Sequence, residues 1–99
     1  MTDSRKAVKI TIKSFATLRE VMDAQVQLEV GEGATVRSLL DALITRYPGL
    51  DEMIFSSPGS PRDFVNILRN GRNIQFLSGL DTPLADGDLV ALFPPAAGG

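Results

Sequence analysis

A single amphipathic helical segment, with strand-like segments on both sides, most constrains what this chain can fold into. Between Thr35 and Tyr47 apolar residues recur with the 3.6-residue period of a helix that buries one face. Thr35 is the expected N-cap, and Pro48-Gly49 ends the segment because proline disfavours a helical residue before it. A single helix can bury its apolar face only against another layer of secondary structure, so the rest of the chain is expected to form a sheet. The apolar members are Val36, Leu39, Leu40, Leu43, Ile44 and Tyr47.

The segments around this helix have the patterns of strands. Apolar and polar residues alternate over 8–12 and 26–30, which predicts two half-buried strands paired as an antiparallel hairpin. After the helix, 64–69 is a predicted strand, Asn70-Gly71 a turn, and 74–77 a short strand or edge. The wholly apolar segment Leu89–Phe93 is typical of a central strand.

Shorter segments connect these elements. We expect a short helical piece within 15–21 and a helical turn over 50–55. Residues 56–63 (SSPGSPRD) form a loop by composition, and 80–84 is a connection with one buried anchor at Leu84. Asp86-Gly87-Asp88 is a predicted turn whose Asp side chains accept backbone N–H bonds.

The element order β-β-α-β-β-β with one long helix defines an α+β domain of two layers. The 99 residues allow one domain. We expect a frayed N-terminus over 1–7, the folded domain over 8–93, and an extended, flexible C-terminal tail over 94–99.

The composition excludes several kinds of function. The sequence contains no His, Cys or Trp, which rules out disulfides, thiolate nucleophiles, Ser-His-Asp catalysis and most zinc sites, so we expect no metal. The net charge is −2 with no basic block, so no nucleic-acid partner is expected. No apolar stretch approaches the ~20 residues of a membrane span, and the polar start is no signal peptide, which predicts a cytoplasmic protein.

The tail is the most informative feature for function. The sequence finishes in Gly98-Gly99, preceded by Pro94-Pro95-Ala96-Ala97. Glycine has no Cβ, so two in a row form a thin end that can enter a narrow site on another protein. The prolines favour an extended conformation that projects the last residues, with a reach of about 20 Å. Because the sequence contains neither Cys nor His, any covalent chemistry of this chain is expected at a backbone terminus or a lysine.

The segment PLADGDLVALFPPAAGG (83–99), together with FATLRE (15–20), Val65-Asn66 and Asn70-Gly71, resembles ubiquitin-like sulfur carriers of the MoaD type, in the MoaD/ThiS family. This resemblance spans nearly the whole chain. It implies the β-grasp fold: a mixed sheet of four to five strands, with the first and last strands parallel at its centre and the main helix packed on one face.

The resemblance also implies a chemistry. An E1-like adenylating enzyme of the MoeB type would use ATP to adenylate the carboxylate of Gly99, and sulfur from a donor would displace AMP to leave a thiocarboxylate. The chain would donate this sulfur, for molybdopterin (molybdenum cofactor) biosynthesis, to the large subunit of molybdopterin synthase (MoaE type). It would be a non-catalytic cosubstrate that binds no cofactor, with Pro94, Pro95, Ala96, Ala97 and Gly98 forming the tail that leads to Gly99.

A partner surface is expected on the uncovered face of the sheet. The last strand is apolar on both faces, and only one face can fill the core; exposed apolar patches on small domains often mark interfaces. The resemblance suggests Phe15, Leu77 and Phe93 for this surface, with Arg19 pairing across it. Each of the three apolar residues could instead belong to the core, and Arg19 could be a solvated surface residue.

Other functions share the same tail. The chain could carry sulfur for tRNA thiolation, thiamine or cysteine synthesis. It could also be a protein modifier whose Gly99 forms an isopeptide bond with lysines of target proteins. A binding module with an inert tail is the fourth possibility, and the sequence alone does not separate them.

Overall fold

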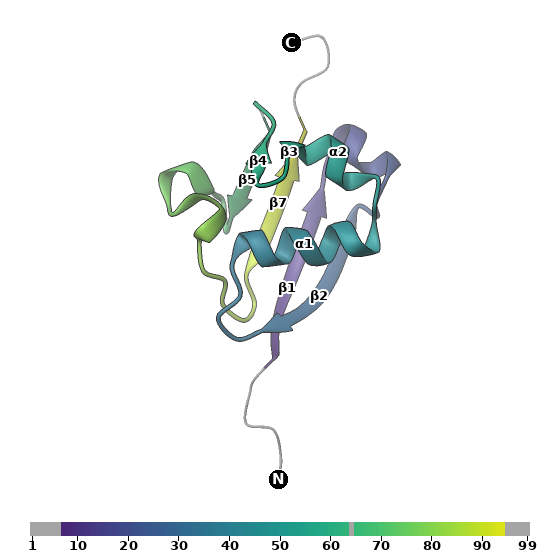
Figure 1. The fold of residues 1–99 in the computed structure, drawn as a ribbon. Coiled ribbons are helices and arrows are strands. Elements are labelled where there is room, and N and C mark those ends of the chain that lie inside the picture. Colours follow the sequence, from purple (N-terminus) through teal and green to yellow (C-terminus); the bar gives the residue numbers. More distant parts are fainter. Residues whose placement is uncertain (1–6, 64, 95–99) are drawn as a thin grey trace.

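A computed structural model describes residues 7–63 and 65–94. The segment 1–6, Phe64 and the tail residues 95–99 lie outside the described residues, and so do the expectations that concern them. A five-stranded mixed sheet, with strand order β2-β1-β7-β5-β6, forms one layer, and helix α1 crosses one of its faces (Figure 1). This is the β-grasp arrangement, as predicted.

The first two strands form the predicted antiparallel hairpin. β1 spans Ala7–Ser14 and β2 spans Gln25–Gly31, and Ile10 lies opposite Leu28 in their register. The alternating residues Val8, Ile10 and Ile12 are buried, as their period of two requires. The predicted helical piece between the strands is the 3-10 helix η1, Ala16–Glu20, whose Leu18 is buried.

The last strand lies at the centre of the sheet. β7, Leu89–Phe93, pairs in parallel with β1 on one side and antiparallel with β5, Asn66–Arg69, on the other. β6, Arg72–Asn73, pairs antiparallel with β5 and forms one edge. The predicted turn at Asn70-Gly71 is confirmed: φ is 50° at Asn70 and 85° at Gly71, a left-handed conformation that both residue types tolerate.

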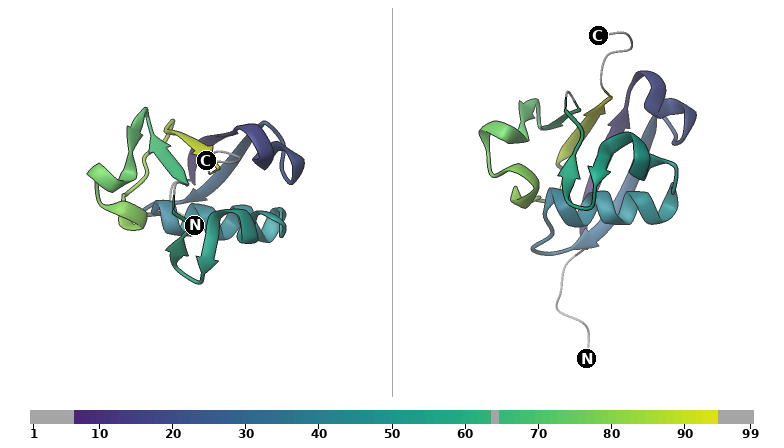
Figure 2. Two further views of the ribbon diagram at one scale, coloured as in Figure 1. Left: turned by 90° about the horizontal axis from the view of Figure 1, so that it is seen from above. Right: turned by 45° about the horizontal axis from the view of Figure 1, so that its top comes forward.

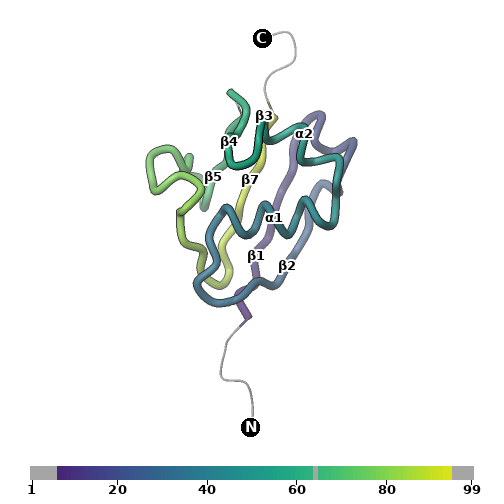
Figure 3. Tube along the Cα trace, viewed as in Figure 1, coloured from purple at the N-terminus to yellow at the C-terminus, as the bar shows by residue number. Residues whose placement is uncertain are grey.

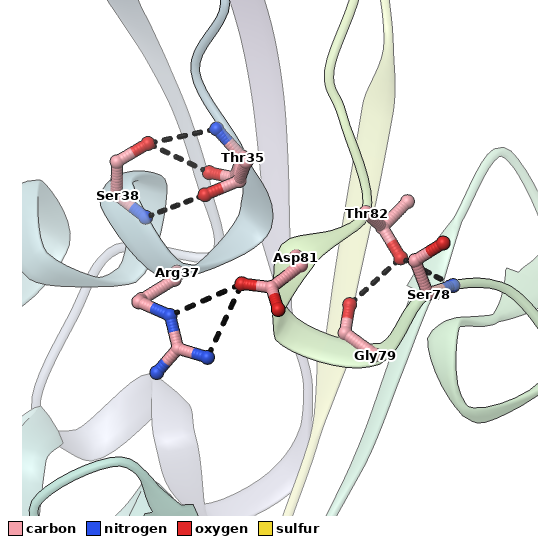
Figure 4. A network of polar contacts seen from close by, with 7 residues as sticks. All are labelled: Thr35, Arg37, Ser38, Ser78, Gly79, Asp81 and Thr82. Carbon is pink, nitrogen blue, oxygen red and sulfur yellow. Dashed lines mark hydrogen bonds and ion pairs between the residues drawn. The ribbon is translucent and has the colours of Figure 1, made fainter.

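Helix α1, Val36–Arg46, begins and ends where its sequence signals predict. The Thr35 hydroxyl accepts a hydrogen bond from the Ser38 N–H, and the Ser38 hydroxyl oxygen accepts one from the Thr35 N–H, which is a reciprocal capping box (Figure 4). Arg37 in the first turn contacts Asp81 at 3.3 Å, which connects the helix to the segment before β7 (Figure 4).

The core lies between α1 and the sheet. Four residues of the helical stripe are fully buried, and Ile44 and Tyr47 pack partly buried against them. The helical turn predicted over 50–55 is α2, Leu50–Ile54, which lies on the same side of the sheet as α1 (Figure 2). The fully buried apolar residues of both layers are Ile10, Ile12, Leu18, Val36, Leu39, Leu40, Leu43, Leu50, Ile54, Val90 and Leu92.

The prediction of a loop over 56–63 is wrong. β3, Phe55–Ser57, and β4, Ser60–Pro61, form a short antiparallel hairpin beside α2 (Figure 2). Pro58-Gly59 makes its turn, and Gly59 has φ +75°. The Pro- and Gly-rich composition suggests a loop, but Pro61 lies at the edge of a two-stranded ribbon, where its lack of an N–H donor is tolerated.

Three segments in the second half also differ from the prediction. The third strand of the main sheet begins at Asn66. The strand expected over 74–77 is the 3-10 helix η2, Ile74–Phe76, because the Asn73 side chain accepts a hydrogen bond from the Gln75 N–H and caps it. The connection 80–84 overlaps the 3-10 helix η3, Gly79–Asp81, and has three buried residues, Leu80, Thr82 and Leu84, where one was predicted.

Candidate functional site at the end of the last strand

The ends of β1 and β7 meet at one end of the sheet. Since the two strands are parallel, Ser14 at the end of β1 lies beside Leu92 near the end of β7. Figure 3 shows the turn after β1 close to the last part of β7. Pro94 follows β7 and is the last described residue, so the first residue of the expected tail starts from this point. Pro95, Ala96, Ala97, Gly98 and Gly99 lie outside the described residues.

Two aromatic rings stack where the strands end. The centroids of Phe15 and Phe93 are 4.4 Å apart and their planes differ by 7°. Both residues continue the open-face rows of their strands, beyond Lys13 and Ala91, and both are half-buried. Pairs of this kind contribute about 0.5–1.5 kcal/mol beyond the area they bury. The stack therefore fixes Phe93, the residue from which Pro94 departs.

Arg19 contacts the same aromatic pair. Its guanidinium carbon lies 5.3 Å from the centroid of the Phe15 ring, within range of a cation–π interaction worth about 0.5–1 kcal/mol at an exposed site. Its Nε donates a hydrogen bond to the Ser14 carbonyl at 2.9 Å. Three of the four residues expected at a partner surface, Phe15, Phe93 and Arg19, thus lie together.

The chain turns at Ala16 in an uncommon conformation. Ala16 has φ 54°, in the left-handed region that costs a residue with a Cβ roughly 1–2 kcal/mol. This turn takes the chain from β1 into η1 and brings Arg19 back to Phe15. Alanine is not a residue type that indicates a left-handed conformation, so the sequence does not predict the unfavourable φ at Ala16.

The fourth expected residue, Leu77, lies elsewhere. It follows η2 at the β6 edge of the sheet, where it lines a surface cleft with Leu68 and Phe76. Phe76 is 86% exposed, and its position was predicted to be in a strand. Because the 3-10 turn at 74–76 depends on the Asn73 cap, the exposure of Phe76 could not be read from the apolar pattern.

A buried carboxylate fixes the start of β7. Asp88 accepts hydrogen bonds from the Ala85 N–H at 2.8 Å, the Asn70 amide at 2.9 Å and Arg69 Nε at 2.8 Å. Burial alone would raise the pKa of Asp88. The hydrogen bonds from Ala85, Asn70 and Arg69, with the charge of Arg69, outweigh this and hold the pKa below its usual value. Asp86 accepts the Lys9 N–H at 2.8 Å, so the predicted Asp turn is confirmed.

The described residues contain no group of three or more acidic, His or Cys side chains placed to hold a metal ion. None of the helices in ranges 7–63 and 65–94 has the length and apolar character needed to cross a membrane.

Comparison with known families decides the classification. Residues 12–99 match the ThiS family, which covers most of the chain. The chain belongs to the ThiS family. It is thus a small ubiquitin-like protein of a non-catalytic type, in agreement with the prediction that it is not itself an enzyme.

The relatives of this ThiS-family chain have names that indicate different functions. Small archaeal modifier protein 3 of Haloferax volcanii is 39% identical over 93 residues, which cover 93% of this chain and 100% of that protein. The sulfur carrier protein CysO of Mycobacterium tuberculosis (strain H37Rv) is 41% identical over 94 residues, with 93% and 100% covered. The molybdopterin synthase sulfur carrier subunit of the same organism is 34% identical over 94 residues, with 93% and 99% covered.

A solved structure agrees with the fold. The crystal structure of small archaeal modifier protein 1 from H. volcanii superposes with a TM-score of 0.80 at 38% sequence identity, covering 90% of this chain and 99% of that one. The main prediction, a carrier for molybdopterin synthase, is therefore supported at the level of the family, whereas the modifier and the other sulfur carrier match at higher identity.

Proposed function

We propose that the chain is a ubiquitin-like sulfur carrier or modifier whose Gly99 carboxylate is activated by an E1-like adenylating enzyme. The observation that carries the proposal is that β7 ends at an open end of the sheet, and the sequence continues through Pro94 to Gly98-Gly99 within the family match. The domain presents the carboxyl group, and a second protein supplies the catalytic side chains.

The proposed chemistry is an acyl activation. One carboxylate oxygen of Gly99 attacks the α-phosphorus of ATP, and pyrophosphate leaves. A sulfide nucleophile from the donor then attacks the acyl carbon, and AMP leaves to give the thiocarboxylate. If the amine of a target lysine attacks an activated acyl carbon instead, an isopeptide bond forms. Gly98 leaves space around the reacting carbon because it has no Cβ.

The destination we favour is not molybdopterin synthase. The modifier and CysO relatives are 39% and 41% identical, while the molybdopterin synthase carrier is 34% identical. Transfer of sulfur in another pathway, or of the chain itself to lysines, is therefore the leading assignment. Molybdopterin synthesis with a MoaE-type partner is the second candidate, supported by the match to the molybdopterin synthase carrier.

An ATP–pyrophosphate exchange assay with the E1-like enzyme of the same organism tests the activation step. The full chain should stimulate exchange, and a variant that lacks Gly98 and Gly99 should not. An N-terminal tag, placed at the other end of β1, should leave exchange unchanged. Equal stimulation by the truncated variant would mean that the tail is inert and the domain only binds.

Products then separate the destinations. A ladder of heavier conjugates that survives denaturation and reduction, detected with an antibody against the chain, indicates a modifier. A single charged species without conjugates indicates a sulfur carrier. Stable co-purification with a molybdopterin synthase large subunit would favour the second candidate over the first.

A further inference from the structure

We propose that Phe15, together with Arg19, positions the C-terminal tail: the pair holds Phe93 in place and so sets the point and direction from which the tail begins. This inference rests on the proposed function, because a fixed starting direction matters only if the tail must enter another protein's active site. It gives Phe15 and Arg19 a role within the chain that is distinct from the direct partner contact predicted from the sequence, which stays a prediction.

The pairing of the strands shows why Phe93 needs support. On the β1 side, the last ladder pair is Ser14 with Leu92, whereas on the β5 side Phe93 still pairs with Asn66. The backbone of β7 is thus held from one side only at its last residue. Phe15 is the next residue after this ladder, its backbone is extended (φ −133°, ψ 155°), and its ring stacks on Phe93 with 4.4 Å between the centroids. The ring contact therefore supports Phe93 on the side where the ladder has ended.

Arg19 ties the Phe15 ring to the end of β1. Its Nε donates to the carbonyl of Ser14, the same residue that closes the ladder with Leu92. Its guanidinium carbon is 5.3 Å from the Phe15 centroid. The Phe15 ring is contacted by a guanidinium that is itself hydrogen-bonded to the backbone, so few Phe15 rotamers are compatible with these contacts. Phe15 therefore restricts the movement of the Phe93 ring stacked on it.

The backbone conformation at Ala16 supports the same role. A residue with a Cβ stays in the left-handed region only where its surroundings determine its conformation, and such residues are frequent at functional sites. Here φ 54° at Ala16 is what turns the chain sharply after Phe15 and returns Arg19 to it. The unfavourable backbone conformation at Ala16 is therefore what places the side chains of Phe15 and Arg19 next to each other.

Because of Pro94, the conformation of Phe93 determines the direction in which the tail begins. A proline restricts the residue before it to extended conformations and fixes its own φ near −65°. Few rotations therefore separate the Phe93 ring from the start of the tail. When Phe15 releases Phe93, the tail start gains a wider range of directions, and fewer molecules present Gly99 correctly once bound to the activating enzyme.

The first test needs no partner. In ¹⁵N relaxation measurements on the full chain, the order parameter of the Phe93 amide should fall from about 0.85 toward about 0.6 in Phe15→Ala, while the Ile12 amide stays unchanged. Phe15→Tyr keeps a ring and should restore the wild-type value. Arg19→Ala should give a smaller decrease. Its matched control is Arg46→Ala, which removes the cation–π contact with Tyr47 at the C-terminal end of α1.

Charging kinetics provide the second readout. With the activating enzyme, ATP and sulfide, Phe15→Ala should lower kcat for thiocarboxylate formation about 10-fold with KM changed less than about 2-fold, because misplaced reactants cost rate after binding. Phe15→Tyr should restore kcat, and Arg46→Ala should leave both constants unchanged.

Two results would overturn the positioning role: an unchanged order parameter at Phe93 in Phe15→Ala, or a raised KM with unchanged kcat, which indicates contact with the partner. If the wild-type chain is not charged at all, the proposed function fails, and the relaxation measurement still decides whether Phe15 immobilises Phe93.

Discussion

Asp88, at the start of β7, shows how one side chain can connect segments that are distant in sequence. It is buried, and its three hydrogen-bond donors come from Ala85 in its own turn and from Arg69 and Asn70 at the end of β5. The sequence predicts an Asp turn from the pattern Asp-Gly-Asp. It does not predict Arg69, at the end of β5, or Asn70, in the turn that follows, as donors, because the pairing of β5 with β7 is what brings them close to Asp88.

Asp88→Asn should lower the free energy of unfolding at pH 7 by about 2 kcal/mol, since an amide cannot accept from all three donors and loses the charge that faces Arg69. The folded pKa is depressed, so the stabilisation is present above the unfolded pKa of about 3.9 and is lost as pH falls through the folded pKa. Urea denaturation at several pH values measures both effects.

The control for this variant is Asp86→Asn. Asp86 is exposed and accepts a single N–H, which an Asn oxygen can still accept, so stability should change little. If Asp88→Asn were as stable as the wild type at pH 7, or if its deficit were the same at pH 3, the role assigned to the carboxylate would be wrong.

At the scale of elements, α1 illustrates a helix whose ends are set locally. The capping box joins Thr35 and Ser38, and Tyr47 closes the helix with its N–H bonded to the Leu43 carbonyl at 2.7 Å. Both boundaries are predictable because the signals lie within a few residues of each other.

Thr35→Ala should lower stability by about 1 kcal/mol, because the Ser38 N–H loses its acceptor at the first turn. In a thermal melt this is a decrease of about 4–8 °C in Tm. Thr45→Ala is the matched control: its hydroxyl donates to the Asp41 carbonyl within the helix and caps nothing. An equal loss in both variants would argue against a special role for the cap.

The elements that the sequence missed are the short ones. The β3–β4 hairpin and η2 each contain at most three residues per segment, too few for a hydrophobic period to be visible. The hairpin depends on the Pro58-Gly59 turn, and η2 depends on the Asn73 cap. In both segments the amino-acid composition favours a different structure, a loop over 56–63 and a strand over 74–77. Long periodic segments, such as β1 and α1, were predictable because several buried residues repeat the same signal.

The same distinction applies to the candidate site. The apolar character of both faces of β7 is visible in the sequence, but it does not say which face is open; the family resemblance suggests the open face for Phe93 and leaves the core as the alternative. That Phe15 stacks on Phe93 follows from the parallel register of β1 and β7, which no local pattern contains. The separation of Leu77 from this stack likewise follows from the turn after β6.

At the scale of the whole molecule, the first and last strands are neighbours, and this arrangement joins stability to function. The parallel pair β1 and β7 lies at the centre of the sheet, so the final strand is held by core residues such as Val90 and Leu92. A domain built this way can present the residues that follow β7 without loosening its core, which is what a carrier of an activated carboxyl group requires.

The most direct measurement is the intact mass of the chain after incubation with the E1-like enzyme, ATP and a sulfide donor. We expect that one oxygen is replaced by one sulfur, that an N-terminal tag does not interfere, and that a C-terminal tag blocks the change. A mass that stays the same for the untagged chain, or sulfur incorporation despite a C-terminal tag, would contradict it.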